Sequence, residues 1–97
     1  MNYQALIAAR HSVRKFEDLP VSREILDSLV EDASYAPSAK NTKSTGFMII
    51  QDASLLEAIS RMRDFGTAFV AGAKAAIVVL GDPGKSDAWV ENASISA

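Results

Sequence analysis

The chain has 97 residues, which suits one modest domain, and its 10 lysines and arginines against 12 aspartates and glutamates give a formal net charge of -2. This balance excludes binding to nucleic acid or to a membrane surface through bulk charge, so any anionic ligand must be bound locally. The 25 Leu, Ile, Val and Phe residues are enough for one hydrophobic core. No cysteine is present to form disulfides, and a single histidine argues against a zinc site, so we expect no metal.

The amino terminus carries no basic region followed by a long apolar stretch, and the longest apolar run, residues 75–80, is too short to span a bilayer. We therefore expect a soluble protein of the cytoplasm. A chain of this size buries only about 60–68% of the surface that its unfolded form exposes. Its stability must come from packing, from a ligand or from a partner subunit.

The first half of the chain predicts two helices. Tyr3, Leu6 and Ala9 have helical spacing, so a short helix over residues 2–9 delivers residues 10–15 to a loop or an extended segment. Ser22 is a suitable amino-terminal cap for a second helix, which Pro37 ends. This second helix carries an apolar stripe at i, i+3, i+4 and i+7, formed by Leu26, Leu29, Val30 and Ala33.

The second half predicts a loop over residues 38–46, a buried strand over 47–50 and a helix capped by Asp52 or Ser54. The apolar face of that helix comprises Leu55, Leu56, Ile59 and Met62. Residues 65–74 are rich in Gly and Ala and predict no regular element. A second strand over 75–80 ends in a turn at 81–84, and a last helix begins near Ser86. Two strands are too few for an independent sheet, so the chain is part of a domain or completes its fold with another chain.

Positive charge is concentrated in two short segments. Residues 1–15 contain Arg10, Arg14 and Lys15 and no acidic residue, and Lys40 and Lys43 lie in the loop after Pro37. Hydroxyl, amide and imidazole side chains accompany both segments, namely His11, Ser12, Ser38, Asn41, Thr42 and Ser44. Such mixtures suit a ligand with phosphate and sugar groups. The alternative is a solvated basic face, or pairing of the two arginines with the acidic helix at residues 23–35.

Several motifs are excluded or weak. A phosphate-binding loop ending at Lys43 and Ser44 would need glycines at positions 37 and 42, and no G-x-G-x-x-G occurs. His11 has no partner pattern for a catalytic base or a metal ligand. Trp89, within a helix, is more typical of a core or an interface than of flavin stacking.

The order of these features resembles the nitroreductase family of FMN-dependent oxidoreductases. The resemblance rests on the R-H-S-V-R-K-F segment at residues 10–16, a following proline, and an amphipathic helix ending in A-P-S at 36–38 with Asn41 three residues further on. An aromatic-led strand follows, and residues 78–82, Trp89 and residues 91–95 resemble the second strand and next helix of single-domain members. The similarity runs the whole length of the chain.

The resemblance implies an α+β fold, three-layered as α/β/α around a mostly antiparallel central sheet, of which residues 1–97 are the amino-terminal part. It also implies an intertwined homodimer with FMN at two sites built from both subunits. In that family pattern, Arg10, His11 and Ser12 match contacts to the FMN phosphate and ribityl chain, and Arg14 matches a basic residue at the pyrimidine edge. The loop that reaches the flavin, often from the other subunit, is matched by Pro37, Ser38 and Asn41. No side chain is expected to be catalytic.

The implied activity is hydride transfer from NAD(P)H through FMN to an electron-poor acceptor such as a nitroaromatic or a quinone. Two departures stand out. The common family loop has Gln, Pro and Trp where this chain has Lys43, Ser44 and Thr45, which alters the side of the site where the substrate binds. The chain also ends where family members continue. One alternative is a flavin-binding or dimerisation fragment without turnover, and another is a small interaction domain whose basic segment docks an acidic helix.

Overall fold

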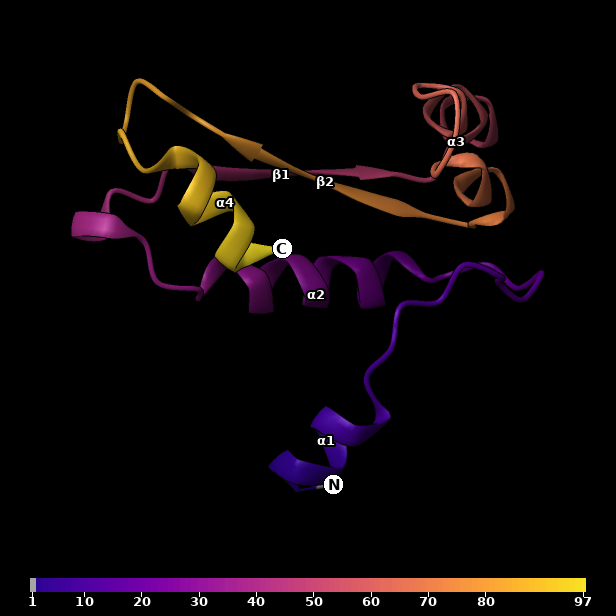
Figure 1. The fold of residues 1–97 in the computed structure, drawn as a ribbon, viewed down its shortest axis with the longest axis horizontal. Coiled ribbons are helices and arrows are strands. Elements are labelled where there is room, and N and C mark those ends of the chain that lie inside the picture. Colours follow the sequence, from indigo (N-terminus) through magenta and orange to yellow (C-terminus); the bar gives the residue numbers. More distant parts are fainter. Residues whose placement is uncertain (1) are drawn as a thin grey trace.

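A computed structural model of the protein describes residues 2–97 (Figure 1). Its helices are α1 (Tyr3–Ala9), α2 (Arg23–Ser34), α3 (Ala53–Ser60) and α4 (Trp89–Ser96), with short 3-10 helices η1 (Ala39–Asn41) and η2 (Ala68–Gly72). The strands are β1 (Thr45–Ile50) and β2 (Ala76–Gly81). Each predicted helix and strand is present, and η2 occupies the Gly- and Ala-rich region to which the sequence assigned no element. The expectation that the strand at 47–50 is buried is wrong for most of its length, because Met48 is exposed and only Ile50 is fully buried in a sheet of two strands.

The two strands pair antiparallel, with a register that runs from Thr45 opposite Gly81 to Ile50 opposite Ala76. Because side chains alternate along a strand, Phe47 and Ile77 lie on one face and Ile50 on the other. α2 and α4 lie on the Phe47 side and α3 lies beyond the opposite side, which gives three layers (Figure 1). β1 begins two residues earlier than predicted, because Thr45 and Gly46 pair with the end of β2.

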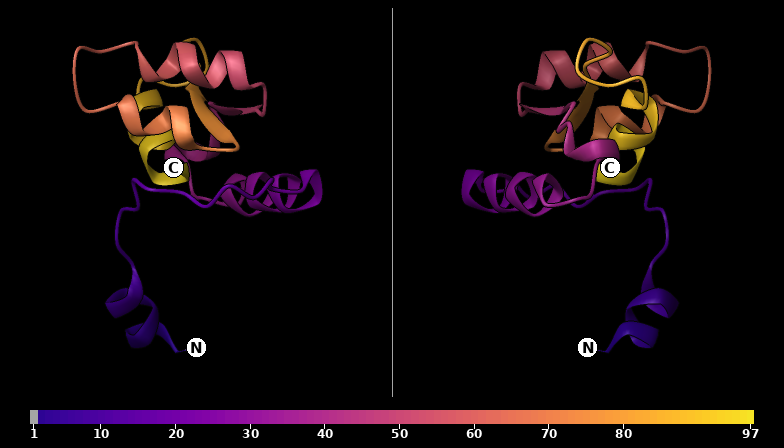
Figure 2. Two further views of the ribbon diagram at one scale, coloured as in Figure 1. Left: turned by 90° about the vertical axis from the view of Figure 1, so that its right-hand side faces the viewer. Right: turned by 90° about the vertical axis from the view of Figure 1, so that its left-hand side faces the viewer.

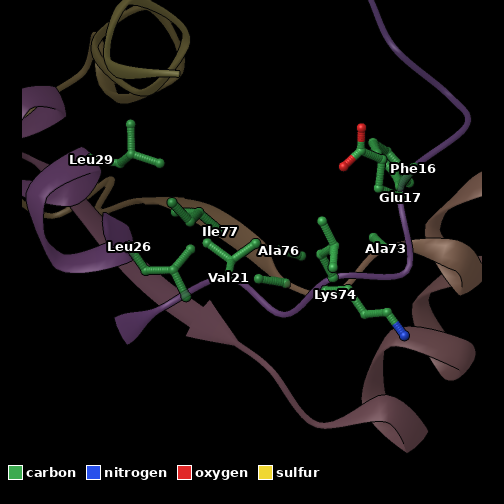
Figure 3. A pocket seen from close by; sticks show the side chains of 11 residues that line it. Phe16, Glu17, Val21, Leu26, Leu29, Ala73, Lys74, Ala76 and Ile77 are labelled. Atoms are coloured by element: carbon green, nitrogen blue, oxygen red, sulfur yellow. The ribbon is translucent and has the colours of Figure 1, made fainter. Parts of the chain in front are cut away.

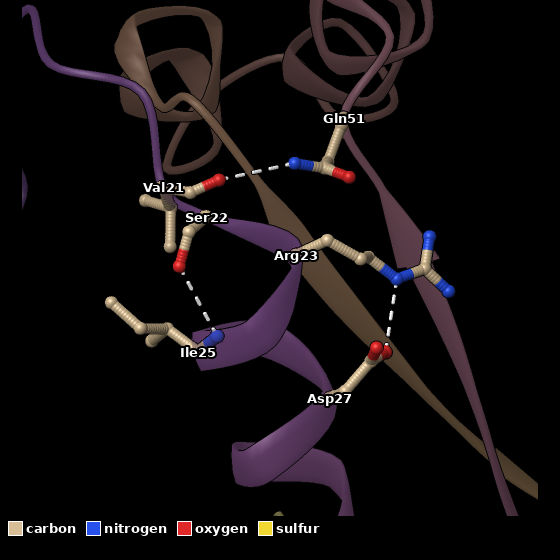
Figure 4. Close-up of polar contacts among 6 residues, drawn as sticks. All are labelled: Val21, Ser22, Arg23, Ile25, Asp27 and Gln51. Carbon is tan, nitrogen blue, oxygen red and sulfur yellow. Dashed lines mark hydrogen bonds and ion pairs between the residues drawn. The ribbon is translucent and has the colours of Figure 1, made fainter.

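α2 begins where the sequence predicts. The Ser22 hydroxyl accepts a hydrogen bond from the Ile25 backbone N–H at 3.3 Å, and Arg23 forms an ion pair with Asp27 one turn later at 2.9 Å (Figure 4). The Gln51 amide donates to the Val21 carbonyl at 3.2 Å. This bond joins the start of α2 to the end of β1, so the helix lies along the sheet.

α3 is shorter than predicted. Asp52 caps its start by accepting hydrogen bonds from the Ser54 and Leu55 backbone N–H groups. The helix ends at Ser60, whose carbonyl accepts a hydrogen bond from the buried Thr67 hydroxyl at 3.0 Å. The prediction that Met62 belongs to the apolar helix face is therefore wrong, because the chain has already turned and Met62 is exposed.

α4 begins at Trp89, three residues after the predicted start. The Ser86 hydroxyl instead accepts a hydrogen bond from the Ala88 N–H and closes a turn before the helix. Trp89 packs directly on Gly81 of β2, where a Cβ atom would lie 2.5 Å from the Trp89 Cε3 and 3.2 Å from its carbonyl oxygen. Glycine at this strand end is what allows α4 to approach the sheet.

Much apolar surface remains uncovered. Only Leu26, Ile50 and Leu56 are buried large apolar residues among those described. The solvent-accessible surface is 7554 Å², against about 5,400 Å² for a compact protein of this mass. The radius of gyration is 15.1 Å, against about 12.5 Å for a compact chain of this length. The fold is therefore open and leaves surface for further packing.

Two uncovered regions account for part of this surface. α1 stands away from the other elements, and none of its residues is buried (Figure 2). An apolar groove of about 360 Å³ runs between the segment before α2, α2 itself and the start of β2 (Figure 3). Phe16, Val21, Leu26, Leu29 and Ile77 are among the residues that line it. No helix within residues 2–97 is long and apolar enough to cross a membrane.

Candidate functional site

The basic segment after α1 is exposed. Arg10 ends α1 with its backbone N–H bonded to the Leu6 carbonyl at 3.0 Å, and its side chain remains at the surface. The His11 Nδ1 lies 3.0 Å from the Ala9 carbonyl oxygen, a hydrogen bond that requires the proton on Nδ1. In the neutral ring this leaves Nε2 as an acceptor. Ser12 is also exposed, so the segment presents a cation, an imidazole and a hydroxyl to solvent.

Arg14 lies against an aromatic pair. Its guanidinium carbon is 5.9 Å from the centroid of the Phe69 ring, within the range of a cation–π contact. Phe16 and Phe69 have ring centroids 6.1 Å apart. The end of the basic segment is thereby fixed beside η2.

Two acidic residues that follow the basic segment, Asp18 and Asp27, form ion pairs with other cations. Asp18 forms an ion pair with Lys74, and the hydrogen bond from that ammonium group is the main reason that the pKa of Asp18 is lowered. Asp27 pairs with Arg23 on α2. Among residues 2–97, Arg10 and Arg14 form no ion pair, so the predicted alternative of pairing with the acidic helix is not what the structure contains.

The loop after α2 has an unusual backbone. Lys40, Asn41 and Lys43 have φ angles of 52°, 54° and 51°, a left-handed conformation that costs non-glycine residues roughly 1–2 kcal/mol each. Ser38 stabilises it from within, because its carbonyl accepts from the Asn41 N–H at 2.9 Å and its hydroxyl accepts from the Lys43 N–H at 3.1 Å. Pro37 precedes this turn and is exposed.

A polar cluster, the Asn92 cluster (Thr42, Ser44 and Asn92), joins this loop to α4. Asn92 and Ser44 are each 2% exposed, and the Asn92 amide donates to the Ser44 hydroxyl at 2.9 Å and to the Thr42 hydroxyl at 3.4 Å. From the sequence, Ser44 is expected only as part of the polar loop, and no role is expected for Asn92. A signal existed, because Asn92 lies three residues after Trp89 and so interrupts the apolar face of α4.

The two halves of the predicted site lie at different ends of the molecule. Residues 10–16 approach the end of α2 that begins at Arg23, whereas the loop at 37–43 leaves its other end (Figure 1). α2 has 12 residues and is therefore about 18 Å long. The structure does not bring Arg10, Ser12 and Arg14 together with Ser38 and Asn41 within one chain.

The residues of the two halves fit a flavin mononucleotide in chemical type. An exposed guanidinium and hydroxyl suit a phosphate, and amide, hydroxyl and backbone N–H groups suit the ribityl chain and ring heteroatoms. Within residues 2–97, no three histidine, aspartate or glutamate side chains gather where they could hold a metal ion.

Comparison with known proteins identifies the family. Residues 7–93 match the sequence model of the nitroreductase family, so the chain belongs to that family. A curated relative from Archaeoglobus fulgidus, named "Putative NADH dehydrogenase/NAD(P)H nitroreductase", is 34% identical over 93 residues, which cover 92% of this chain and 53% of the relative.

Solved structures confirm the predicted fold. An FMN-dependent nitroreductase from Clostridium difficile R20291 superposes with a TM-score of 0.87 at 37% identity, covering 91% of this chain and 51% of that one. A protein from Parabacteroides distasonis, under the same name as the Archaeoglobus relative, gives a TM-score of 0.88 at 34% identity, covering 98% of this chain and 58% of that one. The chain thus spans about half the length of the relatives that it matches.

Proposed function

We propose that this chain forms part of an FMN-dependent oxidoreductase that transfers hydride from NAD(P)H to an electron-poor acceptor such as a nitroaromatic or a quinone. The observation that carries the proposal is the exposed Arg10–Arg14 segment, a cationic and hydroxyl-bearing surface that forms no ion pair within residues 2–97, in a chain of the nitroreductase family. The use of FMN and NAD(P)H is supported by the names of the relatives.

The chain's own residues bind and orient the cofactor. Arg10 and Ser12 hold the phosphate, with His11 beside the ribityl chain, because a charged donor next to a hydroxyl donor matches a phosphate. Arg14 would supply a cation to the pyrimidine edge of the bound ring, where a positive charge stabilises negative charge. Bound FMN supplies the hydride chemistry itself, so no side chain of this chain needs to act as acid or base.

The proposal includes a homodimer in which each site is shared between subunits. Residues 10–14 of one subunit and Pro37, Ser38 and Asn41 of the other form one site. This arrangement is supported by the separation of the two halves along α2 and by the surface area in excess of that of a compact chain. That excess is of the size that obligate dimers bury, about 1,000–2,500 Å² per subunit.

Complementation tests the shared site. Arg10→Ala and Asn41→Ala should each weaken FMN binding in homodimers. In mixed dimers of the two variants, one site carries both changes and the other carries neither, so one of the two sites should regain wild-type affinity. Sites formed within single subunits would instead each carry one change, and no tight site would return.

Anaerobic addition of NADPH or NADH tests the reaction. The flavin absorbance should bleach, and a quinone or nitroaromatic should restore it. Bound flavin that does not bleach would identify the flavin-binding fragment without turnover. Absence of flavin uptake would refute the proposed function altogether.

A further inference from the structure

Asn92 is the one buried residue of α4 in the described structure. Its side-chain bonds to Ser44 and Thr42 join segments 48 and 50 positions apart in the sequence. Buried amides in native proteins are almost always hydrogen-bonded, and here the donors of Asn92 meet two hydroxyl groups of the loop. The Asn92 cluster therefore ties α4 to the loop that leaves α2.

The backbone around the Asn92 cluster is also fixed. The Ser44 carbonyl accepts a hydrogen bond from the Asp82 N–H at 2.7 Å, which ties the loop to the end of β2. Trp89, one turn before Asn92, packs on Gly81 of the same strand. The position of Asn92 relative to the sheet is thus fixed. Its hydrogen bonds can therefore fix the position of the loop.

The loop needs such support. Its left-handed residues, Lys40, Asn41 and Lys43, persist only where the surrounding structure holds them. Ser38 supplies support from within the loop. Thr42 lies between Asn41 and Lys43, and its hydroxyl accepts a hydrogen bond from Asn92 of α4.

We propose that Asn92 is a positioning residue, which holds residues 38–43 in the conformation that presents Ser38 and Asn41 to FMN. The inference rests on the proposed function, and Asn92 itself does not touch the flavin. Loss of its hydrogen bonds lets the loop sample other conformations. Binding then requires the ordering of a looser segment, and the FMN affinity falls in proportion to the fraction of time that the competent conformation remains populated.

Two variants and a control test this role. Asn92→Leu keeps the approximate volume and removes both donors, and Ser44→Ala removes the principal acceptor. Ser94→Ala on the same helix is the control, because its hydroxyl bonds only within α4. The readouts are amide hydrogen exchange at Asn41 and Lys43, the FMN dissociation constant and the visible circular dichroism of bound FMN, measured where each variant is folded.

We expect exchange to be about tenfold faster in both variants, because the loop opens locally. FMN should bind roughly 5- to 20-fold more weakly, and the dichroism of the flavin should change, with no change in the control. Thr42→Val removes the hydroxyl that accepts the longer of the two Asn92 bonds and keeps the bond to Ser44, so it should act in the same direction with a smaller effect, and it serves where the other variants fail to fold.

Unchanged exchange would overturn the proposal, because Asn92 would not hold the loop. Faster exchange with unchanged FMN affinity would also overturn it while leaving the proposed function intact. If the wild-type protein takes up no FMN, the proposed function fails and the positioning role fails with it. Titration of the wild-type protein with FMN therefore distinguishes failure of the positioning role alone from failure of the proposed function.

Discussion

Arg10→Ala should weaken the binding of FMN and leave the binding of riboflavin nearly unchanged, because riboflavin lacks the phosphate that Arg10 is proposed to hold. The Arg10 side chain is exposed and forms no ion pair within residues 2–97, and its hydrogen bond to α1 is made by the backbone N–H, which alanine keeps. The substitution therefore removes a ligand contact without disturbing the fold.

The size of the effect follows from the type of contact. A charge-assisted hydrogen bond contributes about 1.5–3 kcal/mol, which corresponds to a roughly 10- to 150-fold increase in the FMN dissociation constant. Salt screens exposed charges, so we expect the lower part of this range at physiological ionic strength. Flavin fluorescence titrations with FMN and with riboflavin give both constants under the same conditions.

Arg61→Ala is the charge-matched control. Arg61 directly follows the last residue of α3, and its side chain forms an exposed ion pair with Glu57 at 3.6 Å, so its removal changes the net charge equally without touching the site. An equal loss of affinity for FMN and riboflavin in Arg10→Ala, or an equal effect of Arg61→Ala, would refute the assignment of the phosphate to the Arg10 segment.

Four further predictions follow from the structure. Arg14→Gln should lower the two-electron potential of bound flavin by roughly 20–45 mV, the equivalent of a lost contact of about 1–2 kcal/mol, and an unchanged potential in spectroelectrochemistry would remove Arg14 from the site. Sedimentation at micromolar concentration should reveal a dimer, and a compact folded monomer would contradict the shared site. Asp52→Ala should lower the free energy of unfolding at neutral pH, because the hydrogen bond from the Ser54 side chain lowers the pKa of this capping carboxylate in the folded protein. In denaturation curves, the difference in stability between wild type and variant should shrink as the pH falls and the wild-type carboxylate is protonated. Gly81→Ala should destabilise the fold by about 1–3 kcal/mol in the same assay, because the new Cβ overlaps Trp89, and an unchanged stability would mean that α4 does not depend on this close approach.

Local sequence signals predicted most of the fold. The sequence predicts Ser22 as one helix cap and Asp52 or Ser54 as another, because a short polar side chain at that position satisfies free backbone N–H groups. In the structure Ser22 and Asp52 are the caps. The i, i+3, i+4 stripe of α2 correctly placed Leu26 in the core. The turn chemistry at residues 81–84 correctly ended the second strand near Gly81. These features depend on residues within one or two helical turns of each other.

Contacts between distant segments had no such signal. The early start of β1 follows from its pairing with Gly81, and the early end of α3 follows from the hydroxyl of Thr67, seven residues further on. The bonds of Asn92 to the loop span about 50 residues. Only the tertiary structure decides such contacts, because they depend on how elements pack and not on local propensity.

The candidate site also has features that local sequence signals predict and features that only the tertiary structure decides. The residue types in the Arg10–Arg14 segment and in the loop at Ser38 and Asn41 were identified from the sequence, since charge and hydroxyl content are properties of composition. The sequence already predicts a helix between the two segments, and the tertiary structure adds that the chain does not fold back to bring them together, because that helix is rigid and about 18 Å long. The sequence by itself determined the chemistry of each half, and the length of one helix determined that a single chain keeps them apart.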